Sequence, residues 1–281
     1  MRIWLLWALV VIVVAVPAFG NEIFAPNLGN AYPFGMLGGT ISNTGTSVVT
    51  GDVGATITIT GFPPGTATGT VYTAPNSPSS TVGMAYTDFL TAFALANSNV
   101  TTPPTQTLSG LAGPMTLLGN TVYNFSSTDV TSVAGANLEF DANNNSSEVF
   151  IIKITGALTI LGPMTFTLEN GALSSNIYWI VGTDATISPS DVPVTFDGTI
   201  LAGDTFKMSA AVGGSGVLAG TINGCVYAVN ANTLAGQTDI GGCTASATSG
   251  TPEPGSSGLV ALGCLLGGLG LRKFRSVRRT R

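Results

Sequence analysis

The chain has 281 residues and a formal net charge of −5, and only 8% of its residues are charged. All 14 acidic residues lie between Glu22 and Glu253, a stretch whose only cations are Lys153 and Lys207. A body this acidic cannot neutralise a phosphate backbone, which excludes nucleic-acid binding. The chain has no His, which excludes His-based metal sites and the Ser-His triad.

The composition of 37 Gly and 15 Pro favours a mainly β fold with many tight turns, a solenoid or a sandwich. The length allows one domain, predicted over residues 21–243, together with processing segments at both ends. No motif in the sequence indicates a cofactor, so none is predicted.

Residues 1–20 have the pattern of a secretory signal peptide. Arg2 supplies the positive end and residues 3–16 supply the apolar core. Ala18 and Gly20 place small residues where a signal peptidase requires them, so cleavage before Asn21 is expected. The alternative is an uncleaved membrane anchor, against which the helix-breaking Pro17 argues. The pattern therefore predicts an exported protein.

The first part of the body, residues 34–74, has the pattern of short strands. Two strands separated by glycine turns are expected in residues 41–54. The segment 55–60 alternates strictly, which predicts Ile57 and Ile59 on one face and threonines on the other.

Residues 79–97 differ from everything around them, because apolar residues recur there at steps of three and four. This spacing predicts one amphipathic helix, capped by Ser79 or Ser80, with an aromatic stripe that packs on the β-body. Residues 98–110 are rich in Thr and Pro and are expected to form a loop. Strands are expected again near residues 115–118, 121–125 and 137–140.

Residues 149–236 contain a degenerate repeat of short strands. Phe150 aligns with Tyr178, and the segment 195–202 returns as 221–228. Four short strands align so that Ile160, Ile187, Met208 and Leu234 form one column and Thr159, Thr186, Lys207 and Thr233 form the column before it. Because side chains alternate along a strand, stacked coils would expose the second column as a ladder at about 4.8 Å spacing. Exposed strand positions favour Thr in any case, so the ladder alone does not establish a binding surface.

Two of the three cysteines, Cys225 and Cys243, lie in the body. In an exported protein they are expected to form a disulfide, and two free thiols are the alternative.

The C-terminal residues form three segments in order. A Ser/Thr/Gly/Pro linker over 244–256 contains the motif Pro252, Glu253 and Pro254, and an apolar run over 258–271 precedes a basic end over 272–281. The apolar run is short for a full membrane span. Together, residues 252–281 resemble the PEP-CTERM sorting signal of Gram-negative bacteria. The resemblance implies transient membrane anchoring, cleavage by an exosortase, and release to the cell surface or the extracellular space.

The body resembles the microbial ice-binding protein family in a series of short motifs. They read ISNTG, TGDVG, VFIIKI, NGALSSNIYWIVG, FDGTILA and INGCVYA, and they lie within residues 37–236. The resemblance implies a discontinuous right-handed β-solenoid with one long α-helix alongside. It also implies adsorption to ice through a flat face rich in Thr and Ser. The candidate face then holds Thr159, Thr186 and Thr233, with Ser188, Thr205 and Ser209 beside them, and Lys207 interrupts it.

Two other functions are compatible with parts of this sequence pattern and make different demands on it. A structural or adhesive protein of an extracellular polysaccharide matrix could use the same fold without ice affinity. A polysaccharide lyase or hydrolase would need clustered carboxylates with a basic residue. The carboxylates at 184, 191, 197 and 204 occupy turn-like positions expected to be solvated, and the body contains no Arg, so no enzyme is predicted.

Overall fold

The computed structural model describes residues 23–98, 105–189, 192–210, 213 and 216–243. By its internal contacts the chain divides into a unit of residues 1–244 and a unit of residues 245–281. The predicted signal peptide, linker, sorting motif, apolar run and basic end all fall outside the described residues. No helix among the described residues is long and apolar enough to cross a membrane.

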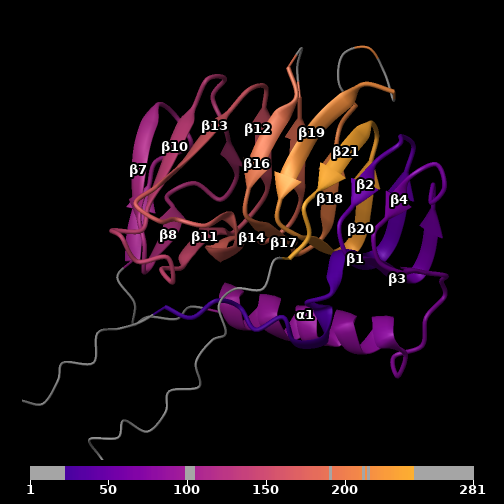
Figure 1. The fold of residues 1–281 in the computed structure, drawn as a ribbon. Helices are drawn as coiled ribbons and strands as arrows, with labels where there is room; N and C mark the ends of the chain where they lie inside the picture. Colours follow the sequence, from indigo (N-terminus) through magenta and orange to yellow (C-terminus); the bar gives the residue numbers. More distant parts are fainter. Residues whose placement is uncertain (1–22, 99–104, 190–191, 211–212, 214–215, 244–281) are drawn as a thin grey trace, which may run out of the picture. The chain divides into compact units, whose positions relative to one another are not determined.

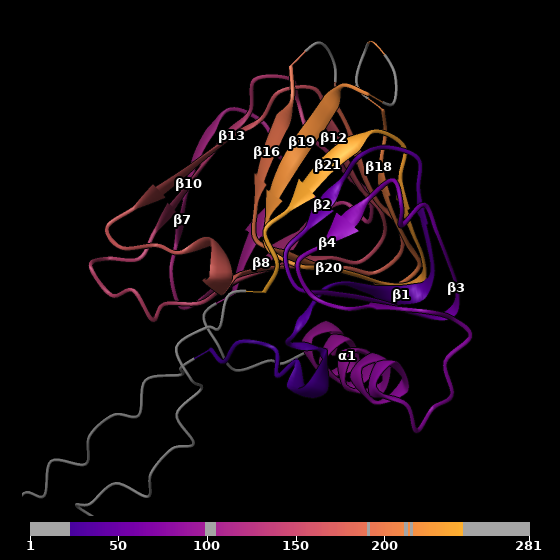
Figure 2. The same cartoon turned by 45° about the vertical axis from the view of Figure 1, so that its right-hand side comes forward.

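Short parallel strands form three faces around one core (Figure 2). The first face, the helix face, contains β6 (Thr105–Leu108), β8 (Thr121–Phe125), β11 (Phe150–Ile154), β14 (Ile177–Val181), β17 (Thr199–Ala202) and β5 (Val71–Tyr72). It also contains the first halves of three long strands, β20 (Val226–Leu234), β1 (Phe34–Asn43) and β3 (Asp52–Thr60).

The second face, called the threonine face here, continues from the same long strands after they turn a corner. It contains β9 (Val130–Thr131), β12 (Leu158–Leu161), β15 (Ala185–Ser188) and β18 (Thr205–Met208), followed by the second halves of β20, β1 and β3.

The third face consists of two sheets. One contains β7 (Pro114–Leu118), β10 (Asn137–Asp141) and β13 (Thr165–Glu169). The other contains β16 (Val194–Asp197), β19 (Leu218–Asn223), β21 (Gln237–Ile240), β2 (Val48–Val49) and β4 (Thr66–Ala67). The described residues also contain two short 3-10 helices, η1 (Gly29–Ala31) and η2 (Ser174–Asn176).

The order of the coils is discontinuous in sequence. Strand β1 pairs with β20, so the N-terminal strands stack on the last coil rather than on the next one along the chain. The chain then runs through helix α1 (Thr81–Asn97), and its next strand, β6, lies at the far edge of the helix face (Figure 1). From there the coils stack back toward β20. The strand β6 lies inside the segment predicted to be a loop, and that part of the prediction is wrong.

Helix α1 forms where the apolar spacing predicts it. The Ser80 hydroxyl caps it by accepting a hydrogen bond from the Gly83 amide at 3.0 Å. Val82, Ala85 and Phe89 are buried against the helix face, and the ring of Phe89 lies edge-on to Tyr227 with centroids 5.5 Å apart. The aromatic stripe is therefore part of the core, as expected.

Lys153, one of the two cations of the body, closes the other end of this helix. Its Nζ donates to the carbonyl oxygens of Asn97 at 3.1 Å and Ser98 at 2.9 Å. A cation at a helix C-terminus satisfies carbonyls that have no partner within the helix and interacts favourably with the helix dipole. Burial lowers the pKa of the Lys153 amine. This lysine therefore has a structural role in docking the helix.

The interior of the solenoid contains an aromatic cluster. The ring of Phe196 lies 5.0 Å from Trp179 and 5.1 Å from Phe166, measured between centroids. Asp197 lies beside this cluster and is only 6% exposed, so the expectation that it is a solvated turn residue is wrong. Burial raises the pKa of its carboxyl, while the hydrogen bond from Asn223 acts in the opposite direction.

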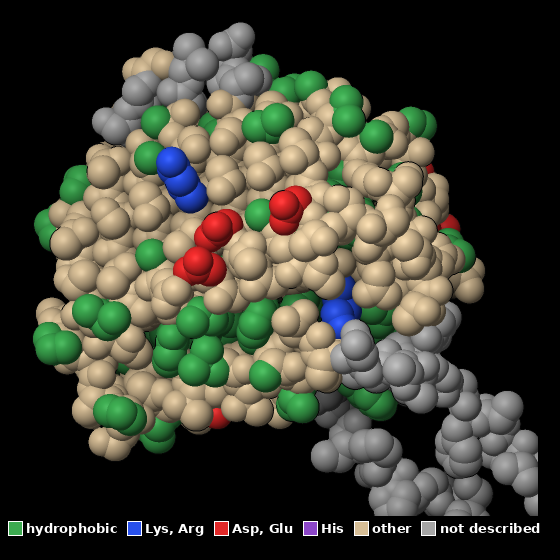
Figure 3. Space-filling view, turned by 180° about the vertical axis from the view of Figure 1, so that it is seen from behind, with side chains coloured by type: hydrophobic (Ala, Val, Ile, Leu, Met, Phe, Trp, Pro, Cys, Tyr) green, Lys and Arg blue, Asp and Glu red, His purple; other side chains and the backbone are tan. Residues whose placement is uncertain are grey.

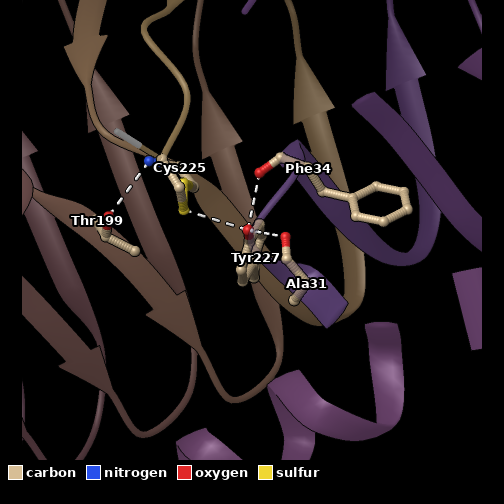
Figure 4. The surroundings of a disulfide bond; sticks show 6 residues. Ala31, Phe34, Thr199, Cys225 and Tyr227 are labelled. Carbon is tan, nitrogen blue, oxygen red and sulfur yellow. Dashed lines mark hydrogen bonds between the residues drawn. A yellow bond between two sulfur atoms is a disulfide. The ribbon is translucent and has the colours of Figure 1, made fainter. Parts of the chain in front are cut away.

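A disulfide joins Cys225, which directly precedes β20, to Cys243, and the two Cα atoms are 5.0 Å apart. Figure 4 shows its surroundings. The buried hydroxyl of Tyr227 lies 2.6 Å from the carbonyl oxygen of Ala31, 2.7 Å from that of Phe34 and 3.2 Å from the Sγ of Cys243. The bond thus ties the end of the body to the strand in the middle of the helix face.

Candidate functional site

The threonine face presents a central column of outward side chains, one from each strand. In strand order the column reads Thr131, Thr159, Thr186, Lys207, Thr233, Ser42 and Thr60. Neighbouring members are direct partners in parallel pairs, so they repeat at about 4.8 Å. The residues that directly follow four members of this column point inward and form the buried column predicted from the sequence. They are Ile160, Ile187, Met208 and Leu234, each with 0% exposure. The predicted register of these four strands is confirmed.

Two shorter columns flank the central one. On one side Thr205 is in register with Ala231, Thr40 and Thr58. On the other side the Ser188 and Ser209 hydroxyls lie 3.3 Å apart, and Leu161 is in register with Ser188. All six predicted site residues therefore lie on one face.

The N-terminal strands enlarge the face beyond the predicted set. Thr40 and Ser42 come from β1, and Thr58 and Thr60 come from β3. The predicted alternation in β3 is correct for Thr58, Ile59 and Thr60 but wrong for Ile57, which is 63% exposed. An extra residue at the corner shifts the β1–β3 register between Gly38 and Thr40, and such a bulge reverses the side-chain alternation.

Charge is sparse on this face. Lys207 is exposed in the central column between Thr186 and Thr233, as predicted. Asp184 and Asp204 lie at the corner toward the helix face, where Asp184 accepts hydrogen bonds from the amide and hydroxyl of Thr205. The second halves of β20, β1 and β3 carry no charged residue. Figure 3 shows a broad surface on this side of the molecule with few charged side chains.

The arrangement suits a flat, extended ligand rather than a reactive small molecule. The hydroxyls and methyls are regularly spaced and held by a continuous ladder of backbone hydrogen bonds. Among the residues that the structure describes, no group of His, Cys, Asp and Glu could hold a metal ion. Asp141 accepts hydrogen bonds from the side-chain amide of Asn170 and the backbone amide of Asn143, which lower the pKa of its carboxyl.

Comparison with known proteins decides the family. The family model described as ice-binding-like matches residues 36–239. The chain belongs to this family. It is 31% identical over 214 residues to an ice-binding protein of Nostoc sp. (strain HG1), across 73% of this chain and 74% of the relative.

Solved structures agree with this assignment. A structure of an ice-binding protein from the Antarctic ascomycete Antarctomyces psychrotrophicus matches with a TM-score of 0.65 and 29% identity, over 79% of this chain and 100% of that one. An ice-binding protein from an Antarctic biological consortium matches with the same TM-score and identity, over 80% and 94%. The expected fold, a discontinuous β-solenoid with one helix alongside, is therefore confirmed. Family membership also supports the expectation of a protein that is not an enzyme.

Proposed function

We propose that this chain is an extracellular ice-binding protein and that it adsorbs to ice through the threonine face. The observation that carries the proposal is the central column, in which six of the positions in strand order are Thr or Ser and only Lys207 differs. A threonine offers ice both a hydroxyl that hydrogen-bonds water and a methyl that orders it. No single contact of this kind is strong, so affinity depends on many contacts held rigidly in a repeat.

The threonine face fits ice better than it fits a polysaccharide. Sugar recognition uses aromatic stacking platforms and convergent polar groups. The outward positions of the two longest columns contain Thr, Ser, Ala and one Lys, and the only aromatic residue in β18, Phe206, is buried. The matrix-protein alternative keeps its support from the C-terminal resemblance alone.

We infer that export and processing follow the terminal signals. Signal peptidase would remove residues 1–20, and an exosortase would cut near Pro252–Pro254 after transient anchoring through residues 258–271, in a Gram-negative host. Intact-mass measurement of the protein from its native host tests this. The mature chain should begin at Asn21 and lack the C-terminal tail, and recovery of all 281 residues would refute the processing scheme.

Lys207 offers a test in which activity should rise. Lys207→Thr completes the ladder between Thr186 and Thr233, so thermal hysteresis at equal protein concentration should increase. The residue is exposed, so the free energy of unfolding should change by no more than about 0.5 kcal/mol. Lys207→Glu is the matched control, because it retains a charge at the same position and should give no gain. Equal activity of all three proteins would show that the centre of this face does not touch ice.

A further inference from the structure

A second set of threonines lies on the third face, on the strands contributed by the N-terminal coil. Thr46 precedes β2 and Thr50 follows it, Val48 lies within β2, and Thr66 and Thr68 come from β4 and the residue after it. All five are exposed, and Val48 is in register with Thr66. We refer to these five residues as the second surface. They repeat the geometry of the threonine face, with parallel neighbours about 4.8 Å apart and alternate residues outward.

The corner between the two surfaces is unusually tight in the N-terminal coil. Thr44 on one side and Thr46 on the other are separated only by Gly45, and both threonines are exposed. A Cβ on Gly45 would lie 2.7 Å from the amide nitrogen of Gln237 and from the carbonyl carbon of Gly236, so no larger residue fits without a shift. In the neighbouring coil Gly236 occupies the same corner. The two arrays therefore meet along a narrow edge.

Buried polar side chains fix this edge from inside. The Asn43 amide donates to the carbonyl oxygens of Gly45 at 2.7 Å and Gly61 at 3.0 Å, and its Oδ1 accepts from the Ser47 hydroxyl at 3.0 Å. Ser47 also accepts a hydrogen bond from the Thr238 amide at 3.0 Å. Asn43 is 4% exposed and Ser47 is 0% exposed. The side-chain polar atoms of Asn43 and Ser47 are thus all hydrogen-bonded, and buried polar groups that are satisfied in this way hold their surroundings in one conformation.

Charge separates this part of the third face from the sheet of β7, β10 and β13. The segments 44–50 and 61–68 carry no charged residue, and Asp239 on β21 borders them. Further along the same face, β10 and β13 expose or half-expose Glu139, Asp141 and Glu169. The sheet that contains β2 and β4, in which β16 also exposes Thr195, is therefore closer in character to the threonine face than the sheet of β7, β10 and β13.

From these observations we propose that the second surface is a further ice-binding surface, inclined to the threonine face across the Gly45 edge. The proposal rests on the proposed function, because its ligand is the same. Two rigid arrays that meet at an edge present hydroxyls and methyls in two planes. One molecule can therefore present either array to ice, and the two arrays meet the ice surface in different orientations of the molecule.

The test uses fluorescently labelled protein adsorbing to a hemisphere of single-crystal ice. Three variants are compared with the parent: Thr66→Tyr on the second surface, Thr186→Tyr on the threonine face, and the double variant. Thr116→Tyr is the matched control, since Thr116 is an exposed threonine on the third face in register with Glu139. Thr46→Tyr supplies a second probe on a different strand in case Thr66→Tyr does not fold.

The parent should label two sets of ice planes. Thr66→Tyr and Thr46→Tyr should each lose one set, Thr186→Tyr should lose the other, the double variant should label none, and Thr116→Tyr should match the parent. If Thr186→Tyr loses all labelling while Thr66→Tyr and Thr46→Tyr match the parent, the second surface is refuted and the proposed function stands. A parent that labels no plane would refute both.

Discussion

Thr186→Tyr should remove most of the thermal hysteresis while leaving the fold intact. Thr186 is an inner rung of the ladder, paired with Thr159 on one side and Lys207 on the other. A tyrosine ring there would stand above the methyls and hydroxyls around it and hold a flat ice surface away from several rungs at once. Because affinity comes from many weak contacts made together, one protruding side chain affects all of them.

The same substitution should barely change stability, because Thr186 is a partly exposed strand position without a hydrogen bond that the fold depends on. The free energy of unfolding should change by no more than about 0.5 kcal/mol. Thermal hysteresis and urea unfolding would be measured on the parent, Thr186→Tyr and the Thr116→Tyr control. Unfolding of Thr186→Tyr would mean that the side chain points inward and that the register is displaced by one residue. Full activity in a folded variant would place adsorption on another surface.

Loss of the disulfide should give the largest change in stability. Cys225 and Cys243 are separated by 18 positions, and a cross-link that closes a loop of this size contributes about 3 kcal/mol in the chain-entropy model. Reducing the oxidised parent, or replacing Cys243 with Ala, should lower the free energy of unfolding by about that amount. The disulfide also holds the last residues of the body against Tyr227. Unfolding of the reduced protein should therefore begin at the C-terminal end of the body.

Reductant supplies the control for this effect. The Cys243→Ala variant should unfold at the same urea concentration with and without reductant, whereas the parent should shift. Thiol labelling of the unfolded, unreduced parent should find neither Cys225 nor Cys243 reactive. Two reactive thiols, or a parent insensitive to reductant, would show that the exported protein does not carry the bond.

Much of the fold was predictable because its signals are local. The helix at 81–97 has a continuous apolar spacing and a serine cap, and both are read directly from neighbouring residues. The sequence pattern aligns the ladder strands correctly because buried and more exposed positions alternate along each strand. Only one register then places both Thr159 and Thr186 on the outer side. The segment 195–202 likewise aligns with 221–228 as predicted.

The alignment fails where alternation is missing. The sequence pattern aligns Phe150 with Tyr178, but the partner of Phe150 in the structure is Ile177. Both β11 and β14 are buried at every position. The core of the solenoid covers one face of these strands, and the apolar cluster that includes helix α1 covers the other. A slip of one residue then exchanges one apolar side chain for another and leaves no trace in the sequence pattern.

The parts contributed by the N-terminal coil could not be found from local patterns. Ser42 joins the ladder only because β1 pairs with β20, and its partner Thr233 lies far away in the sequence. The sequence pattern predicts an alternating run for the threonines of β3, but no local feature indicates which face of the solenoid they join. The tight edge at Gly45 depends on the same long-range stacking, since its close neighbours are Gly236 and Gln237.

Ice partitioning tests the central claim most directly. A single ice crystal is grown slowly from a dilute solution that contains the purified protein and a fluorescent protein of similar size without ice affinity. Ice rejects ordinary solutes as it grows, whereas a protein that adsorbs to its surface is overgrown and incorporated. The account predicts that this protein is enriched in the ice fraction and the companion protein is left in the liquid. Equal exclusion of both proteins from the ice would contradict it.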